Sequence, residues 1–284
     1  MKHVRPKSRF CVRLDLTALL REDSPHPALG GAVDGRQRVA REKGGFWVGV
    51  AAAIFYPGTR LLARRSFDGR DNLPREGGVL LVGNHISHLD PPFAAVFVHK
   101  ARRVPRFLAK DSLWKIPVLG RILRNTGQIP VSRGSADARN SLEAADKALI
   151  DGKVVTIYPE GTLTKDPDLW PMVSRTGVAR LAVEHCVNGS IPVLPLVHWG
   201  THQLWDHERK RLSLFPRKTV VVRVGEPLDL SKFRGRALDN ELLREVTDHL
   251  MGEVRDLLAE VREEQAPTEF YSPRKARKDK QEGE

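Results

Sequence analysis

Short apolar segments alternate with amphipathic segments from Gly78 onward, and this alternation predicts repeated strand–helix units. Runs typical of buried strands cover residues 79–84, 106–110, 127–131, 153–158, 191–197 and 219–225. Segments with a helical spacing of apolar residues follow several of these runs, and the longest begins at Asp239. Because parallel strands covered by helices on both faces are apolar throughout, the pattern predicts an α/β fold with a largely parallel central sheet flanked by helices. Loops at the carboxyl ends of the strands are then the expected place for function.

An apolar run at Phe46–Tyr56 stands apart from this alternation. It is ended by Pro57 and followed by a basic cluster, Arg60, Arg64 and Arg65. A helix that crosses a bilayer needs about 20 apolar residues, so this run is too short to span one. Its aromatic residues beside a basic cluster fit an N-terminal interfacial helix that lies among lipid headgroups. A core helix of the domain fits the same pattern equally well, so both interpretations stay open.

Both ends of the chain are polar. Residues 1–43 carry ten Lys or Arg and five acidic residues, and residues 266–284 carry five and four. Neither segment has a sustained apolar period, so neither is expected to bury enough surface to offset the entropy of ordering. The sequence therefore predicts a basic disordered extension over 1–43, one folded domain over 44–265 and a disordered charged tail over 266–284.

The composition of the whole chain argues against two classes of protein. Hydrophobic residues make up 40% and charged residues 29% of the 284 residues, which is typical neither of a disordered chain nor of a multi-span membrane protein. A net charge of +12 indicates anionic partners: nucleic acid, anionic lipid or a phosphorylated substrate. No basic motif is interleaved with aromatic residues, so we do not expect nucleic-acid binding.

The two cysteines and the N-terminal segment bear on the compartment. Cys11 and Cys186 lie far apart in sequence, which predicts no disulfide framework and no metal-ligand spacing. The first residues show neither the continuous apolar segment nor the small-residue cleavage site of a secretory signal. Both observations favour a reducing, cytoplasmic setting.

A polar motif with the sequence Asn-His-Ile-Ser-His-Leu-Asp-Pro follows the first buried strand, at residues 84–91. Its histidine and aspartate five residues apart, His85 and Asp90, can place a carboxylate on one imidazole nitrogen and leave the other free to accept a proton. The chain has no Gly-x-Ser-x-Gly nucleophile motif, no glycine-rich phosphate loop and no His-Glu-x-x-His motif. The pattern therefore predicts a general base without an enzymic nucleophile, so the substrate must bring its own hydroxyl.

Two other interpretations of this motif exist. His85, His88 and Asp90 could ligate a metal, but no other cluster of His, Cys or acidic residues has ligand-like spacing, so no metal is predicted. The same residues could also serve as the hydrogen-bonding groups of an ordinary turn. Against the turn interpretation stand three further blocks, each at a predicted strand end where a shared cleft would gather them: residues 127–133, 158–162 and 191–195.

Taken in order, these four blocks closely resemble those of the glycerophospholipid acyltransferase superfamily, whose best-known members are the 1-acyl-sn-glycerol-3-phosphate acyltransferases. The resemblance runs from about Phe46 to Leu230, and the stretches 199–200 and 215–220 are similar to actinobacterial members in particular. It implies an acyltransferase domain over 44–265. It also implies transfer of an acyl group from a thioester of coenzyme A or acyl carrier protein to a glycerolipid hydroxyl. No cofactor beyond this co-substrate is implied.

The resemblance also implies a role for each block. His85 would be the base and Asp90 its orienting partner. The second block would place Arg133 on the acceptor phosphate, and the third would place Glu160 and Gly161 beside the acceptor. The further site residues that it marks are Asn84, Ser87, Thr162, Arg175 and Pro192, and the fourth block, which contains Pro192, would shape the acyl-donor side.

One departure from the family pattern concerns the acceptor. Many members have Arg after the Glu-Gly-Thr of the third block, whereas this chain has Leu163, so Lys165 or Arg175 would have to supply the charge. The expected activity is acylation of lysophosphatidate to phosphatidate by an enzyme on the cytoplasmic face of the membrane, where anionic lipid is a partner. The alternatives are an acceptor such as a glycolipid or an amino-acid lipid, or a non-catalytic lipid-binding protein.

Overall fold

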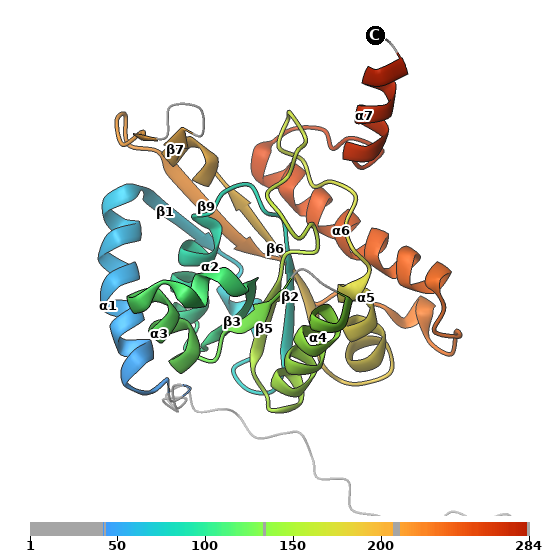
Figure 1. Ribbon diagram of the computed structural model, residues 1–284, viewed down its shortest axis with the longest axis horizontal. Coiled ribbons are helices and arrows are strands. Elements are labelled where there is room, and N and C mark those ends of the chain that lie inside the picture. The colour runs from blue at the N-terminus through green and yellow to red at the C-terminus, as the bar shows by residue number, and fades with distance from the viewer. Residues whose placement is uncertain (1–41, 43, 133–134, 207–210, 283–284) are drawn as a thin grey trace, which may run out of the picture. The chain divides into compact units, whose positions relative to one another are not determined.

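The computed structural model describes residues 42, 44–132, 135–206 and 211–282 (Figure 1). Its centre is a sheet of seven strands in the order β1-β9-β6-β2-β5-β3-β4. The strand bounds are β1 (Arg64–Asp68), β2 (Val79–Gly83), β3 (Pro105–Lys110), β4 (Ile129–Val131), β5 (Val154–Ile157), β6 (Val193–Trp199) and β9 (Thr219–Val224). A small separate hairpin contains β7 (Trp205–Asp206) and β8 (Arg211–Leu212).

The direction of the strands confirms the predicted, largely parallel sheet. Strands β6, β2, β5, β3 and β4 pair in parallel, and β1 pairs in parallel with β9. Within this seven-stranded sheet the pair β6–β9 is antiparallel, so β9 and β1 run opposite to the other five strands. The carboxyl end of β2, the middle strand, therefore lies at the same edge of the sheet as the amino ends of β9 and β1.

Helices cover both faces of this sheet, as Figure 1 shows. One core cluster packs α4 (Ser135–Ile150), α5 (Gly177–Leu181) and α6 (Asn240–Arg262) on one face, and the other packs α2 (Asp90–Lys100) on the opposite face. Helices α1 (Gly45–Leu62) and α3 (Pro117–Asn125) lie on the α2 side. All five residues of β2 are buried, which fits a strand covered on both faces.

Most predicted elements are present, but β1 was not predicted. Its sequence, Arg-Arg-Ser-Phe-Asp, has one apolar residue and lies at the sheet edge, where exposed and half-buried positions alternate. Charged residues are a common protection of an edge strand against further pairing. Hydrophobic periodicity alone could not identify such a strand.

Helix α1 extends beyond the predicted apolar run. The sequence predicted an end at Pro57, yet the helix continues through Pro57 to Leu62. Pro57 is exposed, so its ring meets no packed neighbour there, and the helix loses the hydrogen bond of one N–H at that turn. The side of α1 that faces the domain contacts α2, where the Tyr56 hydroxyl lies 3.0 Å from His99 Nδ1. No helix in the described ranges is long and apolar enough to cross a membrane.

The prediction of a disordered tail over 266–284 is wrong for most of that segment. Tyr271 forms a parallel bridge with Met172, and α7 (Pro273–Glu282) follows it. The aromatic ring of Phe270 packs against the core, with the Arg255 guanidinium 5.4 Å from the ring centroid. Phe270 and Tyr271 thus attach this segment to the domain, although its overall polarity suggested that it had no apolar side chains to bury. The predicted extension over 1–43 lies outside the described residues apart from Glu42, and it stays a prediction.

Candidate active site

The first predicted block forms the loop between β2 and α2, and Asn84 fixes its start. The Asn84 Nδ2 donates to the main-chain oxygen of His198 (3.0 Å), and the His198 N–H donates to Asn84 Oδ1 (2.8 Å). This pair extends the contact between β2 and β6 by one residue beyond Gly83. Asn84 is fully buried, and its two hydrogen bonds to His198 hold the start of the loop.

His85 and Asp90 form the pair that the sequence predicted. The His85 Nδ1 lies 2.9 Å from Asp90 Oδ2, and because a carboxylate accepts, Nδ1 carries the proton. In the described part of the chain no hydrogen bond reaches Nε2. The His85 ring stacks on Tyr158, with centroids 4.5 Å apart and 13° between the planes. Tautomer and ring plane are therefore both fixed, and the remaining lone pair on Nε2 is the free basic site.

The Asp90 carboxylate is held ionised in a buried position. Burial alone would raise the pKa of Asp90, but the hydrogen bond to His85, the nearby histidines and the hydroxyl of Thr201 together hold this pKa below its ordinary value. The Thr201 Oγ1 donates to Oδ1 (2.5 Å), and the main-chain N–H groups of Ile86 and Ser87 donate to Oδ2 (2.8 and 2.9 Å). A carboxylate with this many donors stabilises an imidazolium at His85.

Ser87 serves the turn and offers no nucleophile. Its side chain is buried, and its hydroxyl accepts the N–H of Leu89 (3.2 Å). His88, by contrast, is exposed, with its ring centroid 6.5 Å from that of His85. The Ser87 hydroxyl thus has the hydrogen bond of an ordinary turn, whereas His85 and Asp90 have the geometry that a base and its orienting carboxylate require.

Glu160 joins the third block to the first. Its Oε1 accepts the main-chain N–H of His85 (2.9 Å), and its Oε2 accepts that of Met172 (3.2 Å). Only 4% of Glu160 is exposed. Burial raises the pKa of Glu160 to about 8, although these two amide donors act to lower it. Both oxygens face the protein's own amides, so the geometry makes Glu160 a positioning residue; contact with the acceptor stays a prediction.

The raised pKa of Glu160 predicts a pH dependence of stability. Between the ordinary value of 4.5 and about 8, the folded state holds a proton that the unfolded state has lost, so the free energy of unfolding should fall as pH rises. One such proton contributes up to about 1.4 kcal/mol per pH unit. Urea unfolding at pH 5.5 and pH 8 should show this slope in the wild type and a flatter one in Glu160→Gln. Equal slopes would mean that the carboxylate is already ionised at pH 5.5.

Gly161 and Arg175 lie together at the end of the third block. Gly161 has a φ of +68°, and a Cβ there would lie 3.1 Å from Arg175 Nε, so both backbone conformation and close approach favour glycine. The Arg175 main-chain N–H donates to the oxygen of Pro159 (2.9 Å), which fixes the arginine beside this turn. Thr162 and Arg175 are exposed. The structure thus places a guanidinium at the turn that follows β5, the strand next to β2.

Two predicted site residues are not placed at this edge by the structure. Arg133 lies outside the described residues; the preceding Ser132 donates its hydroxyl to Asp111 (3.2 Å). Pro192 precedes β6 at its amino end, where its carbonyl accepts the N–H of Leu80 (3.0 Å). Leu80 belongs to the start of β2, so Pro192 lies at the edge of the sheet opposite to His85. The expectation that the fourth block joins the shared cleft is wrong, because residues 191–195 begin their strand instead of ending it.

The other end of the same strand contributes residues that were not predicted. His198 is fully buried near the end of β6, and its Nε2 lies 3.2 Å from the Tyr158 hydroxyl. Burial lowers the pKa of His198 to about 4, so this ring is neutral beside the Asp90–His85 pair. Thr201 follows two residues after Trp199. A histidine after an apolar run was visible in the sequence, but its partners lie at distant positions in the chain.

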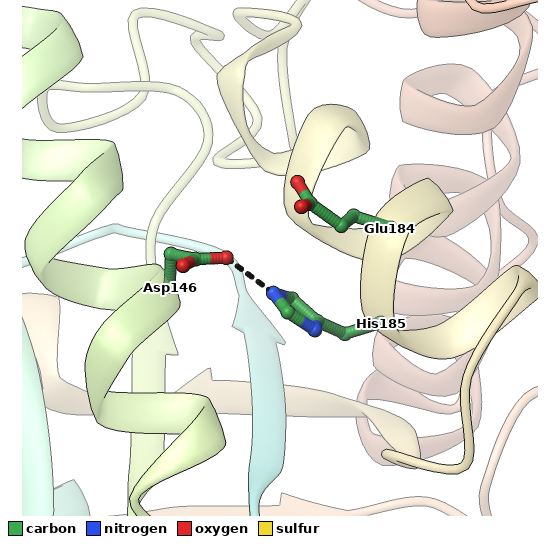
Figure 2. Close-up of side chains that lie close together, drawn as sticks. All are labelled: Asp146, Glu184 and His185. Atoms are coloured by element: carbon green, nitrogen blue, oxygen red, sulfur yellow. Dashed lines mark hydrogen bonds and ion pairs between the residues drawn. The ribbon is translucent and has the colours of Figure 1, made fainter.

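A separate group of three side chains lies close enough together to hold a metal ion. Asp146, Glu184 and His185 bring one ligand atom each within 4.8 Å of one another, and the side chains of Glu184 and His185 both extend toward α4 (Figure 2). The His185 Nε2 lies 2.5 Å from Asp146 Oδ1. Sequence spacing does not identify this group, because its members come from α4 and from a π-helical turn, Ala182–Val187. It lies near the amino ends of β5 and β6, away from His85.

The fold and this site define a class of protein: an α/β domain with a buried carboxylate and its histidine partner at the carboxyl end of the central strand. Residues 64–199 match the family model described as Acyltransferase, which is just under half of the chain.

Several similar proteins have names of the same kind. A 1-acyl-sn-glycerol-3-phosphate acyltransferase of Borreliella burgdorferi is 29% identical over 58% of this chain and 61% of its own length. An N-acylphosphatidylethanolamine synthase of Arabidopsis thaliana is 28% identical over 53% of this chain and 56% of its own length. The crystal structure of the 1-acyl-sn-glycerophosphate acyltransferase PlsC from Thermotoga maritima superposes with a TM-score of 0.56 at 25% identity, covering 78% of this chain and 85% of that one. This chain thus spans about three fifths of the length of the first two relatives.

Proposed function

We propose that this protein transfers a fatty acyl group from a thioester of coenzyme A or acyl carrier protein to the free hydroxyl of lysophosphatidate, which gives phosphatidate. The observation that carries the proposal is the His85–Asp90 pair with its free Nε2, at the carboxyl end of the central strand of an acyltransferase-family domain. The names of several relatives support this acceptor.

The chemistry needs one base. As the acceptor oxygen attacks the thioester carbonyl carbon, His85 Nε2 takes the hydroxyl proton, and the ionised Asp90 stabilises the imidazolium that forms. The tetrahedral intermediate then expels the thiolate, which takes the same proton back from His85 and leaves as a thiol. The C–O ester bond replaces the C–S bond, and the histidine returns to its neutral form. Because the acceptor is the nucleophile, the enzyme needs no serine.

The phosphate of the acceptor would bind on the β5 side of β2. Arg175 at the Gly161 turn supplies a planar donor that suits two phosphate oxygens, and Arg133 would supply another after β4. Leu163, at the position where many relatives have Arg, is half-buried and cannot take this role. Lys165 is exposed two residues later and offers a point charge.

A second acceptor has support from one relative. The similarity to an N-acylphosphatidylethanolamine synthase, together with Leu163, fits an acceptor whose nucleophile is an amine or whose phosphate is not a monoester. His85 would play the same part toward that nucleophile. The two candidate acceptors would differ only in the headgroup that binds at Arg175.

Acceptor kinetics separate these two candidates. The purified protein is given one acyl-coenzyme A and, in turn, lysophosphatidate, lysophosphatidylethanolamine and monoacylglycerol in neutral detergent micelles. Our proposal requires the highest kcat/KM for lysophosphatidate. A higher value for either of the other acceptors would replace the acceptor while leaving the role of His85 intact.

We further propose that the protein lies on the cytoplasmic face of the membrane, as a peripheral or monotopic protein. An apolar surface formed by α1, the start of α3 and neighbouring loops is exposed, and its members are Phe46 (76%), Ile54 (49%), Leu61 (79%), Ile116 (47%), Val118 (68%) and Phe215 (87%). Arg60 and Arg217 lie beside this face, since the Arg217 guanidinium donates to the main-chain oxygen of Arg60. Exposed apolar side chains beside cations are typical of a surface that inserts among anionic headgroups.

This surface predicts a specific binding defect. Phe46→Ser/Leu61→Ser should reduce co-sedimentation with anionic phosphatidylglycerol-containing vesicles by at least about tenfold. Each apolar side chain that enters the lipid contributes on the order of 1.5–3 kcal/mol to the free energy of membrane binding. The matched control is Leu238→Ser, which removes an exposed leucine in the segment before α6. Unchanged sedimentation of the double variant would exclude α1 as the membrane contact.

A further inference from the structure

A hollow of about 420 Å³ lies along the outer edge of β1, and six cations line it. They are Arg60, Arg64, Arg65, Arg70, Lys100 and Arg217, with Ala63 and Phe67 as the other lining residues. The volume is in the range of small-molecule sites. The lining includes no acidic residue.

The positive charge of this hollow is not neutralised within the described parts of the chain. None of the six cations forms an ion pair with a described acid, and the nearby Asp68 carboxylate pairs with Arg223 on β9 instead (3.2 Å). Burial, followed by repulsion from Arg65, Arg70 and Arg60, lowers the pKa of Lys100. Unpaired cations that repel one another around a concave surface favour an anion with several charges.

The position of the hollow relates it to His85. Arg64 begins β1, and because β9 is antiparallel to β6, this end of β1 lies at the edge of the sheet where β2 ends. Arg70 follows the other end of β1, so the hollow extends along the strand from that edge toward the opposite one. Three strand spacings separate β1 from β2, or about 14 Å. Gly161 and Arg175 follow β5, on the other side of β2. The hollow and the proposed acceptor side thus lie on opposite sides of the base.

We propose that this hollow binds the phosphates at the nucleotide end of the acyl-coenzyme A donor. The proposal rests on the acyl transfer proposed above and makes coenzyme A, rather than acyl carrier protein, the preferred carrier. Coenzyme A carries a 3′-phosphate and a diphosphate, which match a set of cations spread along one strand. Its pantetheine arm connects these groups to the thioester, and such an arm can reach from β1 toward His85. A folded carrier protein is too large to enter the hollow.

The first experiment measures binding without catalysis. Calorimetric titration of the full chain with 3′,5′-ADP, in the absence of lipid, should show binding to the wild type, and adenosine should give none. Arg64→Glu/Lys100→Glu should bind 3′,5′-ADP at least about tenfold more weakly, because two attractions become repulsions. Both residues are exposed, so the fold should tolerate the change. The matched control, Arg180→Glu on α5, reverses an exposed arginine outside the hollow and should bind like the wild type.

The second experiment compares donors in neutral detergent micelles. The double variant should raise the KM for acyl-coenzyme A by about tenfold or more and leave the KM for acyl-pantetheine and both kcat values unchanged. An equal rise in KM for both donors would overturn the proposal. So would a defect of the double variant that is confined to transfer from acyl carrier protein thioester, or one that is confined to sedimentation with anionic vesicles. So would a wild type that does not bind 3′,5′-ADP. If the wild type binds 3′,5′-ADP but transfers no acyl group, the hollow is assigned correctly and the proposed function is wrong.

Discussion

Replacement of His85 by alanine is expected to lower kcat by about 10²- to 10⁴-fold, which is the range that a placed general base contributes. The ring is 15% exposed and makes one side-chain hydrogen bond, to Asp90. The main-chain N–H that Glu160 accepts is retained in the variant, so the loop should keep its position. The measurement is steady-state kcat with acyl-coenzyme A and lysophosphatidate, together with a thermal melt to show that the variant is folded.

His88→Ala provides the control for this loss. His88 lies in the same loop and is exposed, so His88→Ala removes the same type of side chain and leaves the His85–Asp90 hydrogen bond in place. Turnover of His88→Ala should stay within a few-fold of the wild type. A folded His85→Ala protein with kcat within tenfold of the wild type would rule out His85 as the base.

Replacement of Asp90 by asparagine should be nearly as severe, with kcat lower by up to about 10⁴-fold, the loss known for the same change in a serine-protease triad. An amide at this position can donate to His85 Nδ1 and so select the tautomer that places a proton on Nε2. It also cannot accept all of the donors from Ile86, Ser87 and Thr201. The measurement is kcat at neutral pH, with urea unfolding as the check on stability.

Thr201→Val separates orientation from folding. It removes the donor to Asp90 Oδ1 and leaves the Oδ2 contact with His85 in place, so its kcat should fall much less than that of Asp90→Asn. A larger loss in Thr201→Val than in Asp90→Asn would contradict the assigned order of importance.

The sequence was sufficient for the parts of the site that are local in the chain. A buried run followed at once by Asn84 and His85 marks the carboxyl end of a parallel strand, and the five-residue spacing to Asp90 allows a single turn to join the two side chains. The block at 158–162 was likewise visible, because it stands at the end of the apolar run 153–158. These features depend on neighbours within a few residues.

Features that depend on distant pairing were not predictable in the same way. Thr201 reaches Asp90 across 111 residues, and Asp146 reaches His185 across 39. Pro192 was assigned to the wrong edge because an apolar run predicts a strand without showing whether a given residue lies at its amino end or at its carboxyl end. The edge strand β1 carries three of its five residues charged, so it gave no hydrophobic signal although it borders the cationic hollow.

The most direct test of the central claim is mass spectrometry of the lipid products formed by the purified protein. The wild type is incubated with acyl-coenzyme A of defined chain length and lysophosphatidate, beside His85→Ala at the same concentration. Our account predicts phosphatidate that carries the donated chain in the wild-type reaction, and a signal at the level of the enzyme-free control with His85→Ala. Absence of phosphatidate from the wild-type reaction, or equal amounts from both proteins, would contradict it.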